Sequence, residues 1–166
     1  MPAQKPGGRP VSIVPGDVAG RTTCPYPAPF DAPIAGRTKH ALGNAFDLTQ
    51  FGVNYVTLEP GAMSAQRHWH AREDEFVCVI EGEITLLTDA GETVLKPGMA
   101  AGFKAGDANG HCLVNRSEKT VAYLEVGTRD SEDDVDYPDI DMKAEKRGGR
   151  WRFLHKDGAP YDTSDS

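Results

Sequence analysis

Residues 68–76, HWHAREDEF, bring together side chains of the kinds that bind metal ions. His68 and His70 stand two residues apart, and three consecutive acids follow them, Glu73, Asp74 and Glu75. Residues i and i+2 of a β-strand point to the same face, so a strand here would place both imidazoles side by side. Two imidazoles next to a carboxylate suit a first-row divalent ion. The stretch therefore predicts a metal site.

A third histidine, His111, begins the apolar run HCLVN about forty residues further on. A neighbouring strand of a closed barrel would bring it to the first two as another ligand. His40 and His155 have no partner at ligand spacing, and we do not expect them to bind the metal.

The elements that must position these residues are short strands. Apolar runs separated by Gly, Pro and Asp turns recur about every 8 to 12 residues between Phe46 and Val126: 51–58, 76–80, 84–88, 93–95, 111–115 and 121–126. This spacing is typical of an antiparallel sandwich or barrel. We expect an all-β fold.

The stretch GAMSAQRHWHAREDEFVCVIEG resembles the first sequence motif of the cupins, and GMAAGFKAGDANGHCLVN resembles the second. The resemblance covers roughly residues 46–127 and implies a double-stranded β-helix, the jelly-roll barrel of that family. It also implies four metal ligands, His68, His70, Glu75 and His111. Similar single-domain bacterial cupins are loosely labelled sugar-phosphate isomerases.

Strand phase favours Glu75 among the three acids. If Glu75 points inward, Val77 and Val79 line the interior, while Phe76 and Ile80 face outward. Glu73 and Asp74 then fall in a connection, where acids are usually solvated. Glu75 also has the six-residue interval to Gly82 that the cupin motif shows.

Further residues are candidates for binding a substrate or moving protons. Gln66 shares the phase of the two histidines, and Arg67, Arg72 and Lys104 could hold an anionic group or be surface charges. Tyr123 or Glu125 could act as a general acid or base, and the sequence does not decide between them. The substrate-binding candidates are thus Gln66, Arg67, Lys104 and Tyr123.

Two flanking segments differ from the barrel. Residues 1–45 are rich in proline and predict an extended arm with an edge strand near Val11–Val14. Residues 128–166 begin with an acidic, solvated linker and end in a tail whose Trp151, Phe153 and Leu154 must dock on something.

Composition excludes several functions and partners. The net charge of −7 disfavours nucleic acid and anionic membrane, and no apolar stretch is long enough to span a bilayer. The first residues lack the apolar core of a secretory signal, and three scattered cysteines suit a reducing cytoplasm. A strand that is apolar on both faces, with Trp69 and Phe76 outward, predicts a homodimer.

The predicted ligands suit one divalent transition metal ion and do not distinguish Fe, Mn, Ni or Zn. Three functions are consistent with such a site. The first is an isomerase, epimerase or lyase acting on a small hydroxy-carbonyl or sugar-like molecule, and the second is an Fe(II)-dependent dioxygenase. The third is a module that binds a small molecule without converting it.

Overall fold

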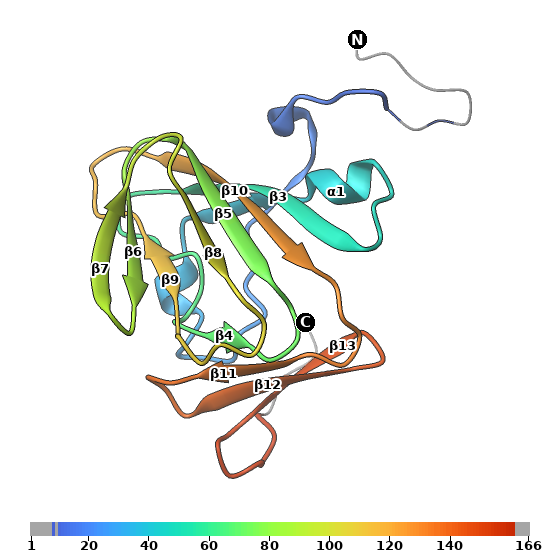
Figure 1. Ribbon diagram of the computed structural model, residues 1–166, viewed down its shortest axis with the longest axis vertical. Coiled ribbons are helices and arrows are strands. Elements are labelled where there is room, and N and C mark those ends of the chain that lie inside the picture. The colour runs from blue at the N-terminus through green and yellow to red at the C-terminus, as the bar shows by residue number, and fades with distance from the viewer. Residues whose placement is uncertain (1–7, 9, 162–166) are drawn as a thin grey trace.

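The computed structural model describes residues 8 and 10–161 and shows an all-β jelly roll (Figure 1). The expected fold class is therefore confirmed. Besides 3-10 turns at Pro15–Asp17 and Ala32–Ile34, one α-helix is found among the described residues, α1 (Leu42–Ala45). No helix in this part of the chain is long and apolar enough to cross a membrane. The strands are β1 (Gly20–Arg21), β2 (Arg37–His40), β3 (Phe51–Leu58), β4 (Trp69–His70), β5 (Glu75–Glu81), β6 (Ile84–Thr88), β7 (Gly91–Leu95), β8 (Ala100–Phe103), β9 (Cys112–Val114), β10 (Val121–Thr128), β11 (Asp134–Tyr137), β12 (Met142–Arg147) and β13 (Arg150–Leu154).

A six-stranded sheet in the order β1-β2-β3-β10-β5-β8 forms one wall of the molecule. Its pairs are antiparallel, and β3 and β10 are in register from Leu58 opposite Val121 to Phe51 opposite Thr128. Strands distant in the sequence are therefore neighbours, because β10 lies between β3 and β5. This order is what brings residues of the arm, the barrel and its last strand onto one surface.

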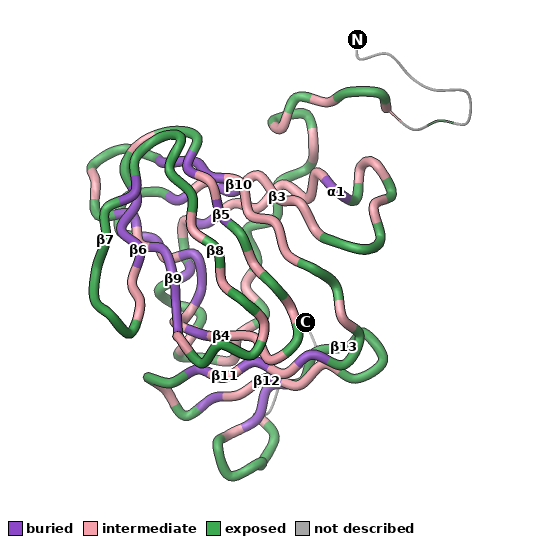
Figure 2. Tube along the Cα trace, in the orientation of Figure 1, coloured by how far each residue is buried: buried purple, intermediate pink, exposed green. Residues whose placement is uncertain are grey.

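Two smaller sheets face this wall, β7-β6-β9 and β13-β12-β11-β4 (Figure 1). The main core lies between the six-stranded sheet and β6, β7 and β9, where purple segments gather in Figure 2. Its fully or nearly fully buried members include Val56, Leu58, Val79, Ile84 and Val121. Buried residues alternate with less buried ones at Val56 and Leu58 of β3 and at Val77 and Val79 of β5, so one face of each of these strands is turned to the core.

The arm differs from the expected extended segment with an edge strand near Val11–Val14. Those residues form no strand, since Pro15 begins a 3-10 turn directly after them. The strands of the arm are instead β1 and β2, and β2 pairs with β3 as part of the main sheet. The expectation that the first residues carry no secretory signal concerns residues outside the described ones.

Residues 128–161 differ from the expected solvated linker, whereas the tail docks as expected, with Phe153 and Leu154 buried. Strands β11 to β13 form an antiparallel meander, and β11 pairs with β4 next to the histidines. A second core lies on this sheet, where Val135, Tyr137, Met142, Ala144 and Phe153 pack against Tyr26 and Phe30 of the arm. Tyr26 meets Tyr137 and Phe153 edge-on, with ring centroids 5.6 Å apart in both pairs. The two flanking segments thus cover each other.

Candidate metal centre

Backbone pairing places His68 and His111 side by side. The His68 amide donates to the His111 carbonyl at 3.1 Å, and the His111 amide donates to the His68 carbonyl at 2.8 Å. This isolated bridge joins the segment before β4 to the segment before β9. His70 follows on β4, opposite Val135 of β11. Three imidazoles from two distant stretches of sequence are thereby held together.

Glu75 reaches the same place as the first residue of β5. The predicted strand phase is confirmed, because Val77 and Val79 are buried while Phe76 and Ile80 are 45% and 46% exposed. Gly82, just after β5, has a φ of 77°, and a Cβ there would lie 2.5 Å from Val121 Cγ1. Glycine is therefore required at that turn.

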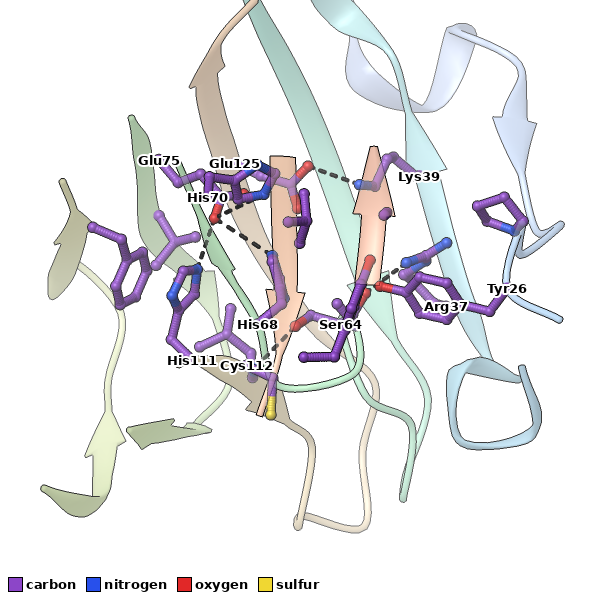
Figure 3. Close-up of a pocket in the computed structure, with 18 of the residues that line it drawn as sticks. Tyr26, Arg37, Lys39, Ser64, His68, His70, Glu75, His111, Cys112 and Glu125 are labelled. Carbon is purple, nitrogen blue, oxygen red and sulfur yellow. Dashed lines mark hydrogen bonds and ion pairs between the residues drawn. The ribbon is translucent and has the colours of Figure 1, made fainter. Parts of the chain in front are cut away.

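The four side chains converge on a single oxygen atom (Figure 3). Glu75 Oε2 lies 2.7 Å from His111 Nε2 and 3.5 Å from both His68 Nε2 and His70 Nε2. Phe103 stacks on His111 with ring centroids 3.5 Å apart and parallel planes, which fixes the orientation of that ring. The donor atoms of His68, His70 and Glu75 all lie within 4.8 Å of one another, and His111 joins them through its contact with Glu75 Oε2.

The other ring nitrogens already have acceptors. The Nδ1 atoms of His68 and His111 face the carbonyl oxygens of Gln66 at 2.8 Å and Asn109 at 3.4 Å. Since a carbonyl only accepts, the Nδ1-protonated tautomer of each neutral ring satisfies this contact and leaves the Nε2 lone pair available to a metal ion. The donor set thus fits a metal ion.

The electrostatics of Glu75 and His70 reflect this arrangement. Burial alone would raise the pKa of Glu75, but hydrogen bonds and charge from the surrounding histidines hold it well below its usual range. Burial would lower the pKa of His70, yet the hydrogen bond to Asp133 and the charge of Glu75 leave it raised. Glu75 is therefore a carboxylate at neutral pH.

Asp133 supports the cluster, and the sequence did not single it out. It is completely buried, and its two carboxylate oxygens accept from His70 Nδ1 at 2.6 Å and from the Arg72 amide at 2.8 Å. A carboxylate on the far nitrogen of a ligating histidine fixes the ring and strengthens the ligand. Asp133 belongs to the acidic run that we expected to be solvated, so for this residue that expectation is wrong.

The two acids before Glu75 have structural partners. Glu73 is not solvated as expected, because its Oε1 accepts from Lys146 Nζ and from the Asp130 amide, both at 2.8 Å. Asp74 is exposed and accepts from the Ala105 amide. Both acids hold the loop before β5 against neighbouring segments.

A cavity of about 230 Å³ opens beside the histidines and Glu75. A cavity of this size is suited to a small molecule. Arg37 and Lys39 of β2 and Tyr123 and Glu125 of β10 also line it, and Lys39 Nζ donates to Glu125 Oε1 at 2.7 Å (Figure 3). Burial would raise the pKa of Glu125, but Lys39 holds it below its usual range.

Of the four substrate-binding candidates, Tyr123 lines this cavity. The structure places Gln66, Arg67 and Lys104 outside its lining. Gln66 Nε2 donates to the Phe30 carbonyl at 2.7 Å, because the chain bends at 64–67 and strand alternation does not extend back from His68. Arg67 forms two 2.7 Å bonds with Asp139, and Lys104 and Arg72 are exposed.

Comparison with known proteins places the fold in a family. The cupin domain matches residues 54–127. A crystal structure of a sugar phosphate isomerase from a cupin superfamily, from Silicibacter pomeroyi, shares 41% identity with a TM-score of 0.87, over 93% of this chain and 98% of that chain. The chain belongs to the cupin superfamily.

Two other solved structures extend the comparison. A protein from Acidithiobacillus ferrooxidans, named as a candidate sugar phosphate isomerase, is 30% identical with a TM-score of 0.69, over 75% of this chain and 80% of that chain. The polyketide cyclase RemF from Streptomyces resistomycificus is 22% identical with a TM-score of 0.57, over 70% and 78% of the two chains, and shares the fold. No curated protein matches the chain.

Proposed function

We propose that the chain is a metal-dependent enzyme that isomerises, epimerises or cleaves a small hydroxy-carbonyl or sugar-like substrate. The observation that carries this proposal is the convergence of three imidazole Nε2 atoms on one carboxylate oxygen. The proposed ligands are His68, His70, Glu75 and His111. A bound divalent Fe, Mn, Ni or Zn ion would polarise hydroxyl and carbonyl oxygens as a Lewis acid. The names of the two most similar structures mentioned above agree with an isomerase.

The cavity wall offers groups for moving a proton. Glu125 is the proton acceptor in this proposal, because its carboxylate lines the cavity together with His68, His70 and Glu75. Burial raises the pKa of the Tyr123 hydroxyl well above its usual value, so that hydroxyl stays protonated and can donate a hydrogen bond to a substrate. Of the two residues that the sequence left open, Glu125 is the one we propose as the general base.

Elemental analysis of protein purified without added metal tests the site. His68→Ala and Glu75→Ala should each lose most of the metal, since each removes a proposed ligand. His155→Ala is the matched control, because His155 bonds Asp141 instead of the cluster. Equal metal content in the wild type and both cluster variants would refute the metal centre.

The reaction class is tested by oxygen consumption. We expect no O₂ uptake when the protein loaded with Fe(II) is offered catechols, thiols or diketones. Uptake with such substrates would instead favour the Fe(II)-dependent dioxygenase, and metal binding without turnover of any hydroxy-carbonyl compound would favour a small-molecule-binding module.

We also propose that the protein is a cytoplasmic homodimer. The outer face of β5 exposes Phe76 and Ile80, and Trp69 and Cys78 are only partly covered. An apolar outer wall of this kind is unusual in a monomer. Light scattering should report twice the chain mass of 17.9 kDa. A monomer at micromolar concentration would exclude the dimer.

A further inference from the structure

The cavity carries more positive charge than its acids balance. Arg21, Arg37 and Lys39 line it together with two acids, Glu75 and Glu125. Lys39 is paired with Glu125, and Glu75 is surrounded by the histidines. In a chain of net charge −7, this local excess of cations marks a place suited to an anion.

Arg37 is the buried cation of the cavity whose positive charge is least compensated. It is only 6% exposed, and its Nη1 donates to the Ser64 carbonyl at 2.6 Å. Its Nε is buried without a hydrogen-bond partner, and no described carboxylate forms an ion pair with the guanidinium. A buried charge without a counter-ion is costly, and buried donors are nearly always satisfied. A bound anion would supply a counter-ion for the guanidinium and a hydrogen-bond acceptor for Nε.

Tyr123 supplies a second unused group in the same part of the cavity. It is completely buried, and its hydroxyl lies near Ser64 but makes no hydrogen bond of standard geometry. Ser64 Oγ instead accepts from the Leu113 amide at 2.9 Å. Ser64 is thus the common neighbour of Arg37 and Tyr123, each of which keeps one buried donor without a partner among the described residues.

Strand register explains why these groups share one surface. Arg37 and Lys39 are two residues apart on β2, so their side chains point to the same face. Lys39 pairs with Val56 of β3, and Val56 pairs with Tyr123 of β10. Val56 is fully buried, so this face is the inner one. The inner face of the six-stranded sheet therefore places Arg37 and Tyr123 in the lining of the same cavity that the proposed metal ligands line.

We propose that Arg37, assisted by the Tyr123 hydroxyl, binds the oxyanion group of an acidic substrate whose hydroxyl or carbonyl oxygen lies at the metal ligands. The inference rests on the proposed metal-dependent function and narrows its substrate class to small hydroxy-carbonyl compounds that carry a carboxylate or a phosphate. A guanidinium suits both groups, because its N–H donors match two oxygens at once. The small cavity suits a compound of a few carbons.

The test is calorimetric titration of the full chain with inorganic phosphate and, separately, with glycolate, each with and without bound metal. We expect saturable binding of at least one probe in both forms. Arg37→Gln should weaken that binding at least about tenfold, and Tyr123→Phe by about two- to tenfold. Tighter binding of phosphate would identify a phosphorylated substrate, and tighter binding of glycolate a carboxylated one.

The matched control is Arg116→Gln, which removes an exposed arginine paired with Glu92 and should bind both probes like the wild type. If the wild type binds neither probe, or if Arg37→Gln binds them equally well, the inference is overturned. If Arg37→Gln does not fold, unchanged binding by the folded Tyr123→Phe variant overturns it. The metal content of the same samples tests the proposed metal-dependent function separately. If the protein binds no metal but the metal-free protein still binds an anion through Arg37, the proposed function fails while the anion site stands.

Discussion

Asp133→Asn should weaken metal binding while leaving the fold intact. The substitution keeps the shape of the side chain and an oxygen for the Arg72 amide, but removes the charge that faces His70 Nδ1 at 2.6 Å. Because Asp133 is completely buried, water cannot replace that charge. Loss of such a partner typically costs 10- to 100-fold in metal affinity, which corresponds to about 1.4 to 2.7 kcal/mol.

Competition with a chelator of known affinity measures this effect, and circular dichroism checks the fold. The chain contains a close control in Asp141, whose carboxylate also accepts from a histidine Nδ1, of His155 at 2.7 Å, and from a backbone amide, of Lys156 at 2.8 Å. Asp141 is exposed and belongs to no metal-ligand group, so Asp141→Asn should bind metal like the wild type. Wild-type affinity in a folded Asp133→Asn variant would refute the reasoning.

Three further outcomes are expected from the structure. The pKa of Glu125 is lowered in the folded state, so its ion pair with Lys39 contributes its full stabilisation above the unfolded-state pKa of about 4.5. This stabilisation is lost as the pH falls through the lower folded-state pKa. Glu125→Gln should therefore make the urea-unfolding free energy depend less on pH across that acidic range. Tyr123→Phe should leave the unfolding free energy of the metal-free protein unchanged or raise it by about 1 to 3 kcal/mol, because it removes a buried, unsatisfied hydroxyl; a clear loss would contradict that account. Phe153→Ala should lower the unfolding free energy by about 3 to 5 kcal/mol, because it removes a buried aromatic ring from the second core. Trp151 is more exposed, so Trp151→Ala should show a smaller loss in the same measurement.

Three members of the histidine–glutamate cluster were predictable from the sequence because their geometry is local. His68, His70 and Glu75 lie within eight residues, and strand alternation is enough to separate Glu75 from Phe76 and to place Val77 and Val79 inside. The all-β class followed from the spacing of turns for the same reason. Each of these inferences needed only the neighbours of a residue in the chain.

Residues whose roles depend on strand order were not predictable in this way. Asp133 lies 63 residues after His70 and meets it only because β11 pairs with β4. Arg37 enters the cavity only because the arm adds β2 to the edge of β3. The strand phase assigned to Gln66 from the sequence does not hold, because the chain bends at residues 64–67 instead of forming a strand. Long-range pairing and a local bend are both invisible to periodicity.

The residues that line or support the cavity come from different parts of the chain. The four proposed metal ligands lie within the matched cupin domain, residues 54–127, and so do Tyr123 and Glu125. Arg37 and Lys39 precede that domain, and Asp133 follows it. Because a barrel with the same ligands can carry different arms, the domain by itself does not determine which anion Arg37 would receive. The arm is consequently the segment in which substitutions should change substrate choice without removing the metal.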